Sequence, residues 1–148
     1  MESYELIFNN ISPKEISVLL KWINFKEKNI LSSHFYFNNK DVKFESIDSL
    51  EIYFNKQNTG NILVKDIYIG TTISKAIIVI SFDDLDGNLT INFSEKDMTI
   101  LNDLILADIC NNILSIMTNL NNATIFFGYE PAEDNDMTLF SLNKNNLV

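Results

Sequence analysis

The sequence predicts an α+β fold, with helices packed mainly on one face of an antiparallel sheet. Several segments rich in β-branched and aromatic residues favour strands. Others place apolar residues at helical spacing. A length of 148 residues, 46% of them apolar, is enough for one hydrophobic core. No repeat or low-complexity linker divides the chain, so we expect residues 1–148 to form a single compact domain.

The chain begins with a predicted strand and helix. The strand is expected over Tyr4–Phe8. Ser12 and Glu15 then stand in the relation of a capping box, with a proline between them where helices accept one. Apolar residues follow at helical spacing, so a helix is predicted over Pro13–Ile23.

The next two elements are short. The aromatic segment His34–Phe37 predicts a strand. Asp48 and Glu51 have the same spacing as the first capping box, which favours a short helix from about Ser49. The β-branched and aromatic content of this segment leaves a strand open as an alternative.

An antiparallel region follows. Asn61–Gly70 and Lys75–Phe82 are rich in isoleucine and valine, and Asn88–Ser94 alternates apolar with polar residues. Each of the three predicts a strand. The dipeptide Asp86-Gly87 between the last two is a signal for a hairpin turn.

The last predicted elements are a long helix and a strand. Ser94 and Asp97 form a third capping pair, and apolar residues then share one helical face, which predicts a helix over about Glu95–Asn119. Ala123–Phe127 reads as a returning strand that ends at Gly128. The predicted order is therefore β-α-β-α-β-β-β-α-β.

Charge is distributed unevenly along the chain. Residues 1–82 hold nine acids and nine lysines, whereas residues 83–136 hold eleven acids and one lysine, a net charge of −10. Arginine is absent, so no bidentate phosphate clamp is available. A negative field repels nucleic acid and anionic membranes and attracts cationic partners. We therefore expect neither direct nucleic-acid binding nor membrane binding.

The N-terminus and the cysteine content favour a cytoplasmic protein. The first residues carry two acids and no base before Lys14, unlike a signal peptide. The longest uninterrupted apolar stretch, Ala76–Ile80, is far too short to span a membrane. The single cysteine, Cys110, excludes an internal disulfide.

Catalytic, cofactor and metal sites lack the residues they need. His34 is the only histidine, and the neighbouring Ser33 points to the opposite face of a strand. Cys110 lies on the apolar stripe of the long helix, where a buried thiol is inert. The four glycines are too far apart for a phosphate-binding loop. We expect no catalytic residues, no cofactor and no metal ligands.

Asp83, Asp84 and Asp86 raise the question of calcium. In the register of an EF-hand, phenylalanines would occupy the first and last ligand positions, where carboxylates are required. The hairpin turn accounts for Asp86, and the other two read as a solvated strand end. All three nevertheless belong to the acidic half of the chain and are included in the predicted partner-binding set.

Four carboxylates crowd into seven residues near the C-terminus: Glu130, Glu133, Asp134 and Asp136. These acids are compatible with a catalytic pair of a hydrolase, with a calcium-binding loop or with a solvated loop. The hydrolase is the weakest of these hypotheses because supporting histidine and arginine are missing. Apolar residues interleave with the acids: Tyr129, Pro131, Met137, Leu139 and Phe140. Apolar anchors beside carboxylates are typical of a protein interface.

At residues 126–142, FFGYEPAEDNDMTLFSL, the chain resembles small cytoplasmic immunity proteins of bacterial polymorphic-toxin and contact-dependent growth inhibition systems. The shared features are a short acidic α+β domain without catalytic residues and a Gly-Tyr-Glu-Pro-Ala segment followed by acids and an apolar strand. The resemblance implies an inhibitor of a cognate toxin, often a basic nuclease.

The resemblance carries over no catalytic residue. From their own chemistry, the predicted partner-binding residues are Tyr129, Glu130, Glu133, Asp134 and Asp136, with Asp83, Asp84 and Asp86. Three other readings stay open: a small-ligand or calcium-binding module, a structural or assembly subunit, and a hydrolase.

Overall fold

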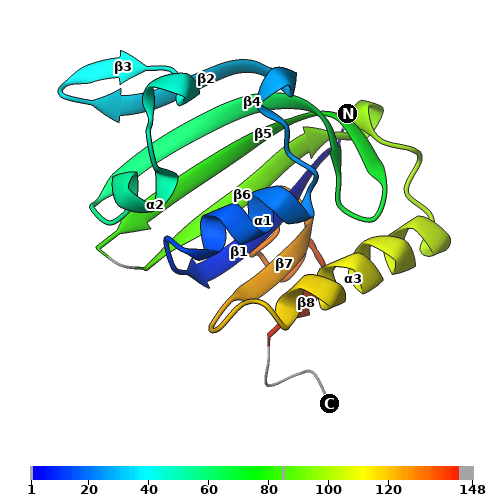
Figure 1. The fold of residues 1–148 in the computed structure, drawn as a ribbon. Coiled ribbons are helices and arrows are strands. Elements are labelled where there is room, and N and C mark those ends of the chain that lie inside the picture. The colour runs from blue at the N-terminus through cyan, green and yellow to red at the C-terminus, as the bar shows by residue number, and fades with distance from the viewer. Residues whose placement is uncertain (1, 85, 144–148) are drawn as a thin grey trace.

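The computed structural model describes residues 2–84 and 86–143, and in that part of the chain eight strands form one antiparallel sheet (Figure 1). The order across the sheet is β3-β2-β4-β5-β6-β1-β7-β8. The strands are β1 (Ser3–Ile11), β2 (Ile30–Phe37), β3 (Lys40–Val42), β4 (Asn58–Tyr68), β5 (Thr72–Asp83), β6 (Asp86–Ser94), β7 (Thr124–Tyr129) and β8 (Thr138–Leu142). The predicted α+β class is confirmed.

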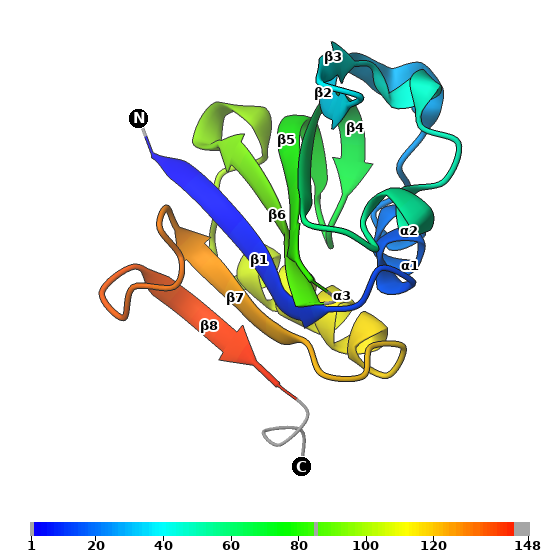
Figure 2. The ribbon, with the colours of Figure 1, turned by 90° about the vertical axis from the view of Figure 1, so that its left-hand side faces the viewer.

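The α-helices lie on the same side of the sheet, which curves around them (Figures 1 and 2). The helices of the described chain are α1 (Glu15–Trp22), α2 (Leu50–Tyr53) and α3 (Asp103–Met117), and the 3-10 turns are η1 (Glu27–Asn29), η2 (Phe44–Ser46) and η3 (Glu95–Asp97). No helix in residues 2–84 and 86–143 is long and apolar enough to cross a membrane.

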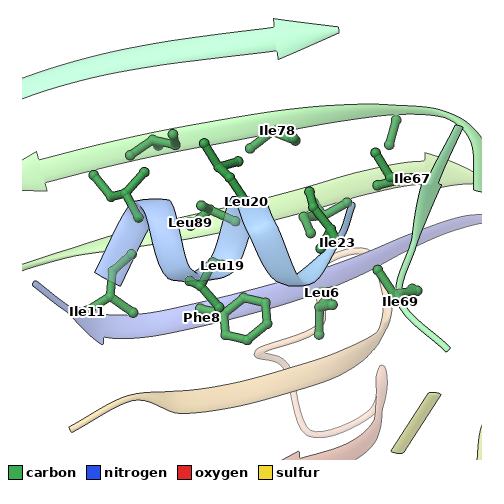
Figure 3. Packing of buried hydrophobic residues seen from close by; sticks show 14 of the residues in the cluster. Leu6, Phe8, Ile11, Leu19, Leu20, Ile23, Ile67, Ile69, Ile78 and Leu89 are labelled. Atoms are coloured by element: carbon green, nitrogen blue, oxygen red, sulfur yellow. The ribbon is translucent and has the colours of Figure 1, made fainter. Parts of the chain in front are cut away.

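The core fills the space between the helices and the sheet (Figure 3). Leu6 and Phe8 of β1 are fully buried, and Phe8 lies beside Leu19 of α1 (Figure 3). Ile109 and Ile113 of α3 are fully buried in the same cluster. Each such side chain contributes about 1.5–3 kcal/mol when it leaves water, so this one face supplies most of the apolar burial.

The capping interactions explain where the helices begin. The backbone N–H of Ser12 donates to Glu15 Oε1 at 2.8 Å, which is one half of the predicted capping box. The other half is not formed, since the N–H of Glu15 donates to the carbonyl of Ser12, and α1 begins after Lys14, which makes no side-chain cap. Ser49 caps α2 with its hydroxyl oxygen, which accepts from the N–H of Ile52 at 3.2 Å.

The long helix starts eight residues later than predicted. Ser94 caps only the short turn η3, where its hydroxyl accepts from the N–H of Lys96. The side chain of Asn102 accepts from the N–H of Ile105 at 2.9 Å and begins α3. Two capping signals therefore compete, and the second one starts the helix.

Two strands were missing from the predicted order. Strand β3 is a three-residue edge strand, and β8 lies where the resemblance placed an apolar strand. The hairpin turn is also shifted: Asp83 pairs with Asp86, so Gly87 belongs to β6 and not to the turn. A Cβ on Gly87 would collide with the ring of Phe82, which explains the glycine by close approach.

Candidate partner-binding surface

The face of the sheet opposite the helices is called the open face below. Side chains alternate along a strand, so the open-face residues lie between the core residues. On β1 the core residues include Leu6 and Phe8, which leaves Glu5, Ile7 and Asn9 on the open face. Ile7 is buried and the other two are half-buried, so something covers this strand from outside.

Residues 130–136, called the acidic loop below, provide that cover. The N–H of Glu130 donates to the carbonyl of Ser3 at 3.0 Å. The N–H of Ala132 donates to Glu5 Oε1 at 3.0 Å, and Asn9 Nδ2 donates to Glu133 Oε2 at 2.9 Å. Ala132 is fully buried. The acidic loop is therefore held along β1 on the open face.

Hydrogen bonds within the acidic loop keep it compact. The N–H of Met137 donates to the carbonyl of Asp134 at 2.9 Å. The hydroxyl of Thr138 lies 2.6 Å from the carbonyl oxygen of Ala132 and 2.9 Å from that of Asp134. The peptide bond between Glu130 and Pro131 is cis. The loop presents its carboxylates from a defined backbone.

The four predicted carboxylates of this loop, at positions 130, 133, 134 and 136, are all exposed. Only some of the predicted apolar companions accompany them. Pro131 is exposed and Met137 is 39% exposed. Leu139 and Phe140 instead pack against the core, and Tyr129 is half-buried with its ring 5.1 Å from that of Tyr4. The acidic loop therefore exposes less apolar surface to a partner than the sequence predicted.

The acids of the β5–β6 hairpin lie on the same face. Asn9, which binds Glu133, pairs with Asn88 of β6. Asp86 precedes Asn88 by two residues, so its side chain points to the same face about 7 Å further along the strand. Asp83 lies opposite Asp86. Asp84, with a left-handed φ of 58°, is exposed at the end of β5.

One carboxylate of this surface, Glu5, has a raised pKa. Burial raises the pKa of Glu5, and the neighbouring Glu130 and Glu133 raise it further, while the hydrogen bond from the N–H of Ala132 lowers it. On the core face, burial and then the neighbouring Tyr129 raise the pKa of Tyr4 to about 12. The acidic part of the open face therefore favours a positive group beside it.

Sequence reasoning missed Glu5 and Asn9, which anchor the loop. The signal was present, because an acid alternates with Tyr4 and Leu6 in the first strand and must face away from the core.

The other titratable residues singled out from the sequence lie elsewhere. His34 Nδ1 is 2.9 Å from Asp41 Oδ2 in an exposed pair. Cys110 is half-buried rather than buried. Within residues 2–84 and 86–143, no group of three histidine, cysteine or acidic side chains is placed to hold a metal ion.

Comparison with known families decides the assignment of this chain. The family described as PABL017 Cdi1I immunity protein matches residues 2–145, nearly the whole sequence. The chain belongs to this family. No curated protein matches it.

A crystal structure at 1.75 Å resolution shares the Cdi1I-family fold. It is described as the toxic C-terminal tip of CdiA from Pseudomonas aeruginosa in complex with immune protein. One of its chains is 17% identical to this one, with a TM-score of 0.70 over 95% of this chain and 94% of that chain. At this identity the likeness concerns the fold.

Proposed function

We propose that this Cdi1I-family protein binds a cognate CdiA-type toxin domain in the cytoplasm and blocks it, and that the acidic part of the open face is a contact surface. One observation carries the choice of surface: acids from two segments some fifty residues apart in the sequence lie on one face. These are Asp83 and Asp86 of the hairpin and Glu133 of the acidic loop.

The chemistry of the surface indicates the chemistry of the partner. A domain that handles nucleic acid needs a basic cleft to hold phosphate. A convergent set of carboxylates matches such a cleft and attracts it over a distance. The proposed mechanism is therefore occlusion: the immunity protein covers the basic surface and the substrate cannot enter. A nuclease is the toxin class that this mechanism fits best.

The hydrogen bonds of the acidic loop support tight binding. A loop that is already held to Ser3, Glu5 and Asn9 loses little conformational freedom when a partner binds it. Its carboxylates are then held in fixed positions opposite the basic groups of the partner, which favours a slow dissociation rate.

The first test is affinity capture of partners from the host cell, with washes at low and high salt. We expect one stoichiometric basic protein whose retention falls as the salt concentration rises, because salt screens exposed charge pairs. Retention that does not change with salt would contradict the acidic-surface mechanism. Absence of any protein partner, or a melting shift with calcium alone, would contradict the function itself.

The second test uses charge-removing variants with the captured toxin. Glu133→Gln combined with Asp134→Asn keeps the acceptor for Asn9 but removes two charges. We expect the dissociation constant to rise by about tenfold, ~1.4 kcal/mol, at low salt. The matched control is Glu51→Gln with Asp108→Asn, two exposed acids of the helical side. Equal binding by both variants would remove the acidic loop from the interface.

A further inference from the structure

The part of the open face away from the acidic loop carries positive charge. Lys65 of β4 and Lys75 of β5 are directly opposite each other, and both are exposed. Like charges in opposite positions destabilise a strand pair. In the described chain, no carboxylate lies within 4.0 Å of either ammonium group. Among the described residues this lysine pair therefore forms no ion pair, although the protein as a whole is acidic.

An apolar strip lies beside the lysine pair. Leu63 and Ile77 are opposite each other, two residues from Lys65 and Lys75 on the same strands. Ile77 is 44% exposed, although it projects from the middle of the sheet. Leu63, Ile77 and Lys75 line a hollow in the surface, with Lys96 and Asp97 at its margin. An exposed apolar strip of this kind, with charges at its edge, resembles the centre of a protein interface.

Asn92 lies at the end of the apolar strip, between its two neighbouring strands. It pairs with Ile77 on one side and with Glu5 on the other, so it stands between the lysine half and the acidic half. Its Oδ1 atom is buried and, among the described residues, has no hydrogen-bond partner. Buried acceptors are normally satisfied. Because this atom is buried, a bound molecule cannot reach it directly, and Asn92 serves here only to mark the boundary between the two halves of the open face.

We propose that the toxin that docks on the acidic loop extends across the open face and places a carboxylate between Lys65 and Lys75. This inference rests on the proposed function. The partner surface it requires has basic groups facing Glu133 and the other exposed acids of the acidic loop, an apolar group over Leu63 and Ile77, and an acidic group facing the lysine pair.

The dimensions of the face fit a folded domain. The row that runs from Leu63 through Ile77 and Asn92 to Glu5 crosses four adjacent strands. At the usual strand spacing, the row is about 14 Å long. A single small anion can contact the lysine pair beside this row but not the acidic end of the face as well, whereas one protein surface can contact both. The pattern of two signs also fixes the orientation of the partner, because a reversed pose brings like charges together.

A nucleic acid fits this surface less well than a protein does. The same face carries Glu5, Glu133 and Asp86, and the chain has a net charge of −9. Such a field repels a phosphate backbone. Lysine is also a point charge without the planar fork that arginine offers to phosphate.

The experiment measures binding of the purified cognate toxin domain to Lys65→Glu/Lys75→Glu. We expect the dissociation constant to rise by at least about tenfold. The control is Lys14→Glu/Lys21→Glu, which reverses two exposed lysines at α1 on the helical side, and it should bind like the wild type. A toxin variant with the facing acid changed to lysine should restore binding to Lys65→Glu/Lys75→Glu.

A second variant guards against a folding defect. Lys65→Gln/Lys75→Gln removes the repulsion between the strands, so it should be at least as stable as the wild type in urea. It should still bind the toxin more weakly. Reduced binding without reduced stability assigns the effect to the interface.

The remaining outcomes distinguish a failure of this inference from a failure of the proposed function. Toxin binding that these lysine variants leave unchanged overturns the inference while the proposed function stands. A wild type that binds no toxin overturns both. A change in the mass of the isolated protein by light scattering, caused by the lysine variants, assigns the face to a second copy and overturns the inference. Tight binding of single-stranded RNA that the variants abolish also overturns it.

Discussion

The two faces of the sheet are made by alternate residues of the same strands, but they serve different purposes. On β5, Ala76, Ile78 and Ile80 are buried against the helices. Their neighbours Lys75 and Ile77 project from the open face and are exposed. One face thus holds the fold together, while the other presents charge and apolar surface outward. Substitutions on the two faces should therefore affect different measurements.

The largest expected effect tests this division directly. Phe8→Ala removes a fully buried ring that contacts Trp22 edge-on, with ring centroids 5.7 Å apart. We expect a loss of about 3–5 kcal/mol in the free energy of unfolding. Ile77→Ala on the open face should cost about 1 kcal/mol or less. Urea denaturation of both variants measures the difference. Similar losses in the free energy of unfolding would mean that Ile77 stabilises the fold as much as a core residue does.

A smaller effect is expected where the acidic loop joins the sheet. A Cβ on Gly128 would collide with the carbonyl oxygen of Met137, which belongs to the backbone and cannot rotate away. Gly128→Ala should therefore displace the start of β8 and cost about 1–3 kcal/mol in stability. It should also weaken toxin binding, because the loop loses its position over β1.

The control for this variant is Gly128→Ala combined with the charge-removing pair at Glu133 and Asp134. If the glycine acts on binding through the loop, the two changes should not be additive. If the two losses of binding free energy simply add, the glycine does not act on binding through the charges of the acidic loop.

The smallest effect concerns pH. The pKa of Glu5 is raised above its ordinary value of 4.5, so the unfolded chain releases this proton at a lower pH than the folded chain does. Stability is then lost as the pH rises through the folded pKa. Glu5→Gln keeps an acceptor for Ala132 but has no proton to lose. Its melting temperature, relative to the wild type, should be higher at pH 7 than at pH 4.

NMR titration supplies the companion measurement. Glu133→Gln removes one of the charges that raise the pKa of Glu5, so the Glu5 pKa should move back toward 4.5. A melting difference that is the same at pH 4 and pH 7 would contradict the assigned cause. So would a Glu5 pKa that does not respond to the change at position 133.

Local signals in the sequence predicted most of the elements and the α+β class. Alternation and β-branched content marked β4, β5 and β6, and the capping box marked α1, because these signals act over a few residues. The start of α3 was wrong because Ser94 and Asn102 are both good caps, and their sequence spacing does not rank them. Strand β3 was missed because three residues carry too little pattern.

The candidate site was only partly predictable, since it depends on strand register. Glu130 to Asp136 stood out by composition, but nothing local placed them over Glu5 and Asn9. The link to Asp83 and Asp86 comes from the pairing of β1 with β6, a contact between segments some eighty residues apart. The lysine pair was invisible in the sequence for the same reason.

The alternation of side chains along the strands has a consequence for how this family can diversify. A residue on the open face can be exchanged without changing the volume of the core, since its neighbours in the chain point the other way. The open face can therefore change its residues while the hydrophobic core keeps its packing. With the toxin on the open face, as proposed above, a new partner would require changes only at every second residue of a few strands.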